Sequence, residues 1–159
     1  MAGLARNGQA RALDAAFFFL AARPRSQREI RMRLERRKFQ KPEIDACLER
    51  LRQFGYVDDR QFAEFWLEQR RQHRPRGARL VFQELRSKGV DRETAEQAFR
   101  VSWHDSDELA LAVRAGQQKV RAYCLLRPHE QRTKLSQFLV RRGFDWATVR
   151  VVVDRLIRF

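Results

Sequence analysis

The residues with the clearest chemical potential are arginines, which gather in three segments of the chain. These segments lie within residues 28–41, 70–88 and 132–142. A guanidinium group pairs through two parallel hydrogen bonds with a phosphate or a carboxylate, so such clusters are typical of surfaces that bind polyanions or acidic proteins. The chain carries 34 Lys and Arg against 20 Asp and Glu, a formal net charge of +14 that ion pairs within the chain cannot neutralise. Two blander interpretations are an arginine-rich genome and arginines that only cover solvated helix faces.

Residue patterns that would support catalysis or cofactor binding are absent from the sequence. It contains neither the phosphate-binding loop Gly-x4-Gly-Lys-Ser/Thr nor the dinucleotide pattern Gly-x-Gly-x-x-Gly. The three histidines and two cysteines lack the spacing of metal ligands. The acidic doublet Asp58–Asp59 stands at an expected helix start, where carboxylates stabilise the helix dipole, so capping explains it better than metal binding. We therefore expect no enzyme activity, no metal and no cofactor.

The elements that position the arginines are expected to be helices alone. The chain has 7 Gly and 4 Pro, too few for the many tight turns of an all-β fold. Apolar residues recur with helical periodicity, and capping residues mark the helix starts. Nine helices are predicted: three over residues 10–22, 58–73 and 76–88, five that begin at Ser26, Pro42, Asp91, Pro128 and Asp145, and one between a polar break at 102–106 and Pro128.

An internal repeat relates three parts of the chain. Leu34, Leu85 and Leu139 each have an apolar residue four positions before them and others five, ten and fourteen positions after them. Four positions after the leucine, the second and third copies have a glycine, Gly89 and Gly143. The first copy has Lys38 at the same position. A glycine in the left-handed conformation followed by a capping Asp joins two helices at a steep angle.

The repeat predicts an all-α, elongated fold of three tandem three-helix repeats, resembling helix-turn-helix units. The expected domains are residues 1–58, 59–104 and 105–159. Units of about 50 residues bury little core on their own, so neighbouring repeats must stabilise one another.

The expected location is the cytoplasm, with no membrane contact. The apolar run Ala15–Ala22 looks like the core of a signal peptide, but Asp14 borders it and Arg23 follows at once. The run is also too short to span a bilayer. Cys47 and Cys124 are expected to be buried thiols, as in a reducing compartment.

Two segments near the middle of the chain carry a more specific pattern. Residues 55–63, GYVDDRQFA, resemble the Gly-Tyr-apolar-Asp/Asn-Asp-x-x-Phe/Tyr-Ala signature of RecX regulatory proteins. Residues 76–90, RGARLVFQELRSKGV, resemble that family's segment Arg-Gly-x-x-basic-apolar-x-x-Glu-Leu-x-x-Lys-Gly. Upstream, residues 16–51 look like the family's first repeat, and Arg141–Phe144 look like part of its last. The resemblance covers about residues 12–157.

The resemblance implies an all-helical modulator of the RecA recombinase. Such proteins bind the RecA–DNA filament, are thought to lie in its groove, and inhibit ATP hydrolysis, strand exchange and co-protease activity. Recombination, DNA repair and the SOS response are then the processes affected. The expected partners are the RecA filament and the backbones of single- and double-stranded DNA, bound by a monomer. We do not expect the protein to recognise a specific DNA base sequence, because the first turn of the expected third helix in each repeat is acidic or apolar.

The first motif is expected to build the junction between the first two repeats. Its residues are Gly55, Tyr56, Asp58, Asp59 and Phe62, with Tyr56 and Phe62 in the core.

The second motif is expected to carry the filament contacts, with Glu84 and Leu85 as structural residues and Gly77 and Gly89 as turn residues. The predicted filament and DNA contacts are Arg76, Arg79 and Lys88, with Arg71 and Arg74 beside them, and Arg36, Arg37, Arg141 and Arg142 from the other clusters. The alternative is an architectural helical protein that binds nucleic acid non-specifically.

Overall fold

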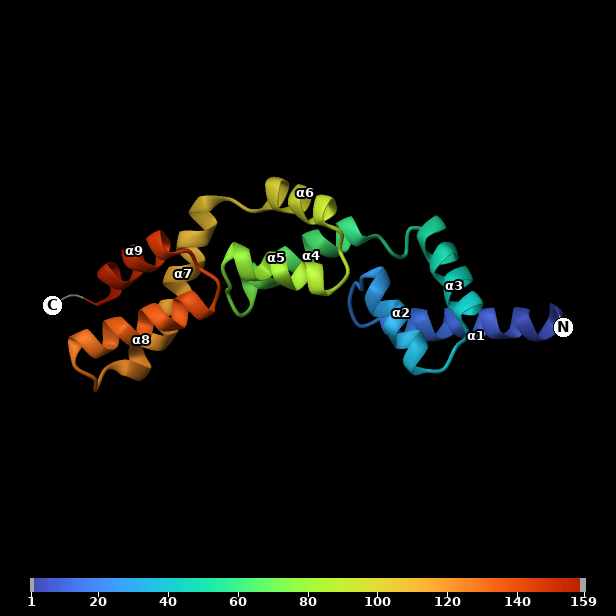
Figure 1. Ribbon diagram of the computed structural model, residues 1–159, viewed down its shortest axis with the longest axis horizontal. Helices are drawn as coiled ribbons and strands as arrows, with labels where there is room; N and C mark the ends of the chain where they lie inside the picture. The colour runs from blue at the N-terminus through green and yellow to red at the C-terminus, as the bar shows by residue number, and fades with distance from the viewer. Residues whose placement is uncertain (1, 158–159) are drawn as a thin grey trace.

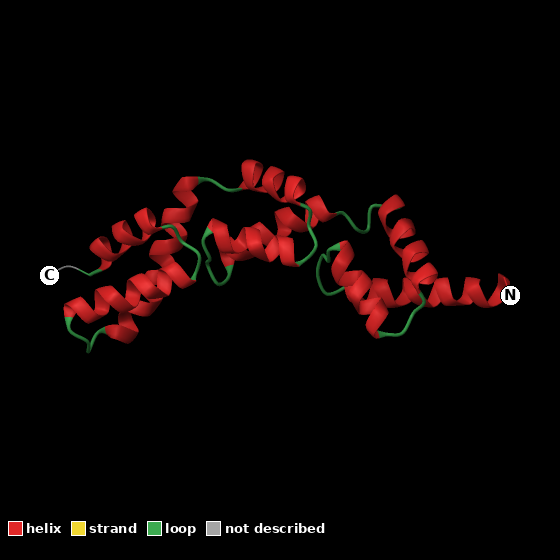
Figure 2. Cartoon of the chain, in the orientation of Figure 1, coloured by secondary structure: helices red, strands yellow, loops and turns green. Residues whose placement is uncertain are grey.

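The computed structural model describes residues 2–157, with their side chains apart from those of residues 2–6, 105 and 106. All regular elements within this range are helical, which confirms the all-α prediction (Figure 2). The described elements are α1 (Ala2–Leu20), α2 (Gln27–Arg36), α3 (Lys41–Gln53), α4 (Asp59–Gln72), α5 (Ala78–Ser87), α6 (Arg92–Ser102), α7 (Asp105–Val120), the 3-10 helix η1 (Arg121–Tyr123), α8 (Pro128–Arg141) and α9 (Trp146–Leu156).

The helices form an elongated, curved molecule, as Figure 1 shows. They group as α1–α3, α4–α6 and α7–α9, and each group encloses its own hydrophobic cluster. In Figure 1 the second helices α2, α5 and α8 lie along the lower, concave side of the arc, and α6 lies on the convex side. The three-repeat architecture is thus confirmed, whereas the exact boundaries 58/59 and 104/105 stay a prediction.

The positions related by the internal repeat occupy the centres of these clusters. The anchors Leu34, Leu85 and Leu139 are fully buried, as are the apolar residues four positions before them. Burying a leucine side chain stabilises the fold by about 1.5–3 kcal/mol. The second helix of each repeat therefore stabilises its hydrophobic cluster through the same two buried positions, the anchor leucine and the apolar residue four positions before it.

The turn after each second helix has the same backbone in all three repeats. Lys38, Gly89 and Gly143 have φ angles of +64°, +86° and +88°. In each turn the next N–H group donates to the carbonyl of the anchor leucine, at 3.1 to 3.3 Å. This is the hydrogen bond of a Schellman motif, so Lys38 occupies a position where glycine is conformationally easier.

The predicted helix starts are also present. Ser26 and Glu29 form a reciprocal capping box, and the Asp91 and Asp145 side chains accept backbone N–H groups in the first turns of α6 and α9. The first helix differs from its prediction, because α1 begins at Ala2 rather than near residue 10.

Two residues predicted to be buried lie at the surface instead. Tyr56 is 59% exposed, because it follows the left-handed turn after α3 and only the next residue, Val57, enters the core. Cys124 is exposed in the turn after η1, where Leu125 is exposed as well. By contrast Phe62 and Cys47 are buried.

The first and second repeats are joined at the N-terminus of α2. The Ser26 hydroxyl, which is fully buried, donates to the Lys88 carbonyl oxygen at 2.6 Å. The Gln27 N–H donates to the Asp59 carboxylate at 2.9 Å. Unpaired N–H groups at a helix start favour such acceptors. Partial burial raises the pKa of Asp59 from its usual value.

The second and third repeats are joined in the same way at the N-terminus of α5. The Gly77 N–H donates to the Arg142 carbonyl oxygen at 2.8 Å, and the Ala78 N–H donates to the Glu108 carboxylate at 3.1 Å. A Cβ on Gly77 would collide with the backbone of Gly143, so glycine is required for close approach rather than for its φ of −72°. At both junctions the turn after the second helix of one repeat therefore packs against the N-terminus of the second helix of the preceding repeat.

Candidate functional site: a basic surface along the concave side

Four guanidinium groups lie close enough to interact electrostatically across the junction of the second and third repeats. Arg70 lies in the last turn of α4, Arg74 and Arg76 lie in the segment before α5, and Arg142 caps the end of α8. Partial burial, and then the charges of Arg76, Arg74 and Arg70, lower the pKa of Arg142 from its usual value. We call these four residues the arginine cluster.

One carboxylate, that of Glu84, forms ion pairs with two members of this cluster. Glu84 accepts from Arg70 Nε at 2.7 Å and also pairs with Arg76. Among the side chains that the structure describes, no carboxylate pairs with Arg74 or Arg142. The cluster therefore keeps a positive surplus that only an external anion can neutralise.

The backbone holds part of this cluster in an unfavourable conformation. Arg74 has a φ of +53°, in the left-handed region that costs a residue with a side chain about 1–2 kcal/mol. The Nε atom of Arg76 is buried and has no hydrogen-bond acceptor within the described structure. Strain and unsatisfied donors of this kind collect at binding sites, because an external partner can compensate them.

Trp66 on α4 organises a second basic group at the junction of the first two repeats. Its ring lies under Lys88 Nζ at 4.2 Å, Arg70 Cζ at 4.4 Å and Arg23 Cζ at 5.8 Å from the centroid. Its Nε1–H donates to Glu84 at 2.8 Å. Arg70 belongs to both groups and so links the basic groups of the two junctions.

Glu29 pairs with the cations on the first-repeat side. It accepts from Arg23 and Lys88 at 2.8 and 2.9 Å. Burial acts to raise the pKa of Glu29, but the hydrogen bonds from Arg23 and Lys88 outweigh it and lower the pKa overall. Lys88 therefore forms an ion pair that links the first and second repeats, and it also adds a positive charge to the surface.

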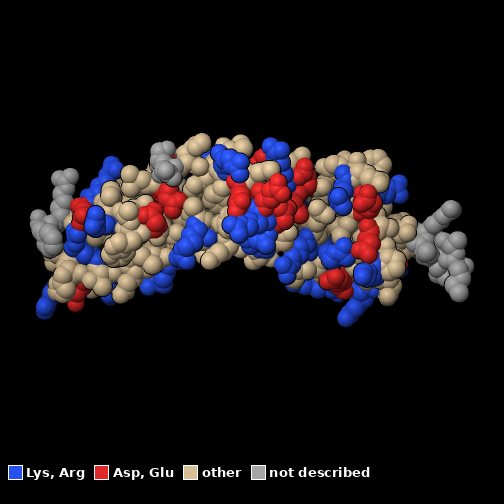
Figure 3. All heavy atoms as spheres, turned by 45° about the horizontal axis from the view of Figure 1, so that its top comes forward, with Lys and Arg blue, Asp and Glu red and all other residues tan. Residues whose placement is uncertain are grey.

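The basic surface continues through the segment before α2 and along α2 itself. The guanidinium groups of Arg25 and Arg33 lie 3.8 and 5.5 Å from the Phe19 ring centroid. Burial, and then the charge of Arg23, lower the pKa of Arg25. In Figure 3 Lys and Arg side chains gather along the lower, concave edge of the arc.

The predicted contact residues separate into two sets. Arg74, Arg76 and Arg142 come together in the arginine cluster. Lys88 lies in the neighbouring Trp66 group, and Arg36 lines the same shallow groove of about 310 Å³ as Lys88.

The other four predicted contacts lie elsewhere. Arg71 pairs with Asp107 at 2.8 Å and so links the second and third repeats. Arg79 is exposed in the first turn of α5, on the side of Glu108. Arg37 and Arg141 are exposed at the ends of α2 and α8.

Sequence reasoning missed several members of this surface. Arg23, Arg25 and Arg33 were not named as contacts, although all three pack on aromatic rings. The contact between Trp66 and Arg70 was not predicted either. Their spacing of i and i+4 on one helix was a signal that could have predicted it. The contact of Arg23 with Trp66 carried no such signal, because the two residues lie far apart in the chain. Arg25 lies six positions after Phe19, across the turn that follows α1, where helical spacing no longer applies.

The chemistry of the surface is anion binding. Its cations are spread over all three repeats, which suits a long polyanion better than a compact ligand. Within the described residues no three His, Cys, Asp or Glu side chains gather as a metal site. Nor is any helix in that range long and apolar enough to cross a bilayer.

Comparison with known families matches all three repeats. Models of the first, second and third three-helix domains of RecX match residues 12–51, 58–98 and 105–153.

Curated relatives agree with these matches over nearly the whole chain. A protein named regulatory protein RecX from Chlorobium phaeobacteroides is 36% identical over 148 residues, which are 93% of this chain and 95% of that protein. The protein of the same name from Prosthecochloris aestuarii is 35% identical over 92% of this chain and 94% of its own length. These relatives are named as regulatory proteins rather than enzymes, in agreement with the absence of a catalytic motif.

Solved structures share the fold. The crystal structure of RecX from Lactobacillus salivarius superposes with a TM-score of 0.78 at 18% identity, covering 95% of this chain and 97% of that one. A second crystal structure of a regulatory protein RecX gives a TM-score of 0.82 at 20% identity, covering 92% and 73%. With three family domains in order along the chain and relatives above 30% identity over nearly all of it, the protein belongs to the RecX family of regulatory proteins.

Proposed function

We propose that this protein binds the RecA–DNA filament and inhibits RecA ATP hydrolysis, strand exchange and co-protease activity, thereby modulating recombination, DNA repair and the SOS response. It acts as a monomer in the cytoplasm. The observation that carries the proposal is the basic surface that crosses both repeat junctions of a RecX-family chain.

The proposed DNA contact is to phosphates and not to bases. Arg74 and Arg142 are available for this contact because no described carboxylate neutralises them. Two of the third helices, α6 and α9, are capped by Asp91 and Asp145, which repel phosphate and keep those helix starts out of a DNA groove. Phosphate binding makes affinity for single strands fall with salt, with a slope of about −0.7 per phosphate neutralised.

The test is a titration of RecA ATP hydrolysis on single-stranded DNA. The basic variant combines Arg74→Glu with Arg142→Glu, which spares the Arg76–Glu84 pair within the second repeat and the Lys88–Glu29 pair at the first junction. The matched control combines Arg100→Glu with Arg155→Glu. These are exposed arginines on the third helices α6 and α9, and the control changes the net charge equally.

We expect the wild-type protein to inhibit well below one molecule per RecA, the basic variant to inhibit more weakly, and the control to resemble the wild type. Inhibition only near saturation of the DNA would instead show competition for the strand. That result would favour the architectural nucleic-acid-binding protein. Equal loss in both variants would refute the assignment of binding to the concave side.

A further inference from the structure

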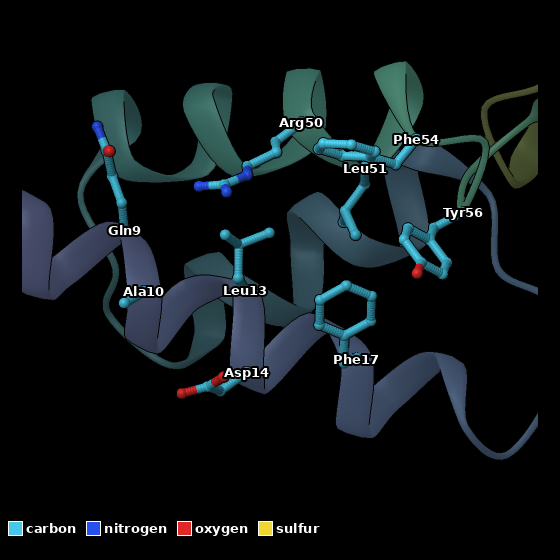
Figure 4. Close-up of a pocket in the computed structure, with 9 residues that line it drawn as sticks. All are labelled: Gln9, Ala10, Leu13, Asp14, Phe17, Arg50, Leu51, Phe54 and Tyr56. Atoms are coloured by element: carbon cyan, nitrogen blue, oxygen red, sulfur yellow. The ribbon is translucent and has the colours of Figure 1, made fainter.

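The first repeat carries an open pocket with an aromatic rim between α1 and α3. Its volume is about 690 Å³, and its lining includes Leu13, Phe17, Leu51, Phe54 and Tyr56. Figure 4 shows Leu13 and Phe17 rising from α1 toward Leu51 and the two aromatic residues at the end of α3. The basic groups described above lie on other elements, so this pocket is a separate surface.

Tyr56 is an exception among the turns of this fold. The turn after α3 is a Schellman motif, in which Gly55 has a φ of +71° and the Tyr56 N–H donates to the Leu51 carbonyl oxygen at 2.9 Å. The residue after the left-handed position normally packs back on its helix. In the other three such turns that residue is buried or half-buried, whereas Tyr56 is 59% exposed.

The neighbouring aromatic side chains are exposed as well. Phe54 is 66% exposed and Phe17 is 41% exposed, and the Phe17 ring meets the Tyr56 ring edge to face at a centroid distance of 4.9 Å. Exposed aromatic residues that gather around a pocket are typical of protein interfaces, where Tyr and Arg supply much of the binding energy.

Arg50 is the charge that points into this pocket. Its guanidinium extends over Leu13 in Figure 4, whereas Asp14 points away from the pocket. The carboxylate beside Arg50 in the chain, Glu49, pairs with Arg52 instead. Among the described side chains none forms an ion pair with Arg50. The pocket therefore offers an apolar floor, an aromatic rim and one cation without a partner.

We infer that this pocket docks a segment of the RecA protomer that presents an apolar side chain beside a carboxylate. This inference rests on the proposed function and divides the filament contact into two parts. The concave arginines bind DNA phosphates, and the pocket of the first repeat binds protein. Arg50 pairs with the carboxylate of the segment while Phe54 and Tyr56 cover its apolar side chain.

Charge complementarity favours an acidic protein segment over the other occupants. A second copy of this chain carries the same net charge of +14, so two copies repel each other. A nucleic acid is disfavoured because Arg50 is the single cation among the residues described as lining the pocket, and the apolar floor offers no further partner to a row of phosphates. A carboxylate beside an apolar group satisfies both the cation and the exposed rings.

The test compares binding to RecA–single-stranded-DNA filaments, formed with a non-hydrolysable ATP analogue, with binding to the same DNA free of RecA. The pocket variants are Phe54→Ala, Tyr56→Ala and Arg50→Glu, each of which changes an exposed side chain. The matched aromatic control is Phe18→Ala, which removes a 78% exposed ring outside the pocket. The charge control is Arg155→Glu on α9, and sedimentation velocity of each protein reports self-association.

Each pocket variant is expected to weaken filament binding by about tenfold or more and to leave binding to free DNA within about twofold. Both controls are expected to match the wild type. Filament binding that is unchanged in the pocket variants but lost in the Arg74→Glu, Arg142→Glu double variant overturns the pocket inference alone. Failure of the wild type to bind filaments more tightly than free DNA overturns the proposed function and the inference together.

Two further outcomes would assign the pocket to another occupant and overturn the inference. An equal loss of binding to free DNA in the pocket variants would identify a nucleic-acid site. A wild-type dimer that Phe54→Ala dissociates would identify a second copy of the chain.

Discussion

Replacing Gly143 with alanine tests how tightly the second and third repeats are joined. Gly143 has a φ of +88°, and a Cβ there would lie less than 3.0 Å from the Cβ of Leu80 on α5, in the preceding repeat. Gly55 has a similar φ of +71°, but nothing lies within 4 Å of the position of its Cβ. Gly55→Ala is therefore the matched control that isolates backbone strain from crowding at the junction.

The expected loss in each variant follows from these contacts. The left-handed conformation costs alanine about 1–2 kcal/mol, and the lower entropy of the unfolded chain offsets about 0.4–1 kcal/mol. Gly55→Ala should thus lower the free energy of unfolding by about 1 kcal/mol. Crowding against Leu80 adds about 1–3 kcal/mol, so Gly143→Ala should lose about 2–4 kcal/mol. For a chain of this size each kcal/mol lowers the Tm by about 2–4 °C.

The assay is urea and thermal unfolding followed by far-UV circular dichroism. Because Leu80 and Gly143 belong to different repeats, Gly143→Ala should also separate the unfolding of the third repeat from that of the others and broaden the transition. The reasoning is refuted if Gly143→Ala loses no more stability than Gly55→Ala. That result would mean that the turn of the third repeat adapts freely at the junction.

Two other changes test the turns and the core. Lys38→Gly should raise the free energy of unfolding by about 0.5–1 kcal/mol in urea unfolding, because glycine avoids a left-handed penalty that exceeds its extra chain entropy. Unchanged or lower stability would contradict the equivalence of Lys38 with Gly89 and Gly143. In thiol labelling of the native protein Cys124, which is exposed, should react at once. Cys47, which is buried and whose pKa desolvation raises to about 11, should react only after denaturation. Equal native rates for the two thiols would contradict this difference in burial.

Helix starts and turns could be predicted from the sequence because their determinants are local. Ser26 with Glu29, and later Asp91 and Asp145, satisfy N–H groups within three residues of themselves. The left-handed position that ends each second helix lies four residues after its anchor leucine, so Lys38 could be aligned with two glycines. Such interactions do not depend on the rest of the fold.

Burial of single residues was less predictable. Tyr56 was expected in the core because it belongs to the family motif, and Cys124 because it stands among apolar residues in the chain. Whether an apolar residue at the end of a helix is covered depends on which element packs above it, and at Tyr56 the Phe17 ring of α1 makes an edge contact that leaves the side chain 59% exposed. The exposed ring is also the basis of the pocket on the first repeat.

For the basic surface, too, some features could be predicted from the sequence and others depend on the tertiary structure. The sequence predicted three arginine-rich segments and a net charge that requires an anionic partner. It could not predict that Arg142 would meet Arg70, Arg74 and Arg76, since their proximity depends on how the third repeat joins the second. Nor could it predict that Lys88 would pair with Glu29, 59 residues away.

The sequence by itself therefore determined the helices, the caps, the threefold repeat, the family motifs and the charge, because each depends on residue type and short-range spacing. The tertiary structure decided which cations are paired and which remain available, and which aromatic residues face solvent. These properties depend on the two junctions, where the Ser26 hydroxyl and the Gly77 N–H bind carbonyl groups of the following repeat. Contacts between residues more than 60 positions apart leave no periodic signal in the chain, so only the folded arrangement reveals them.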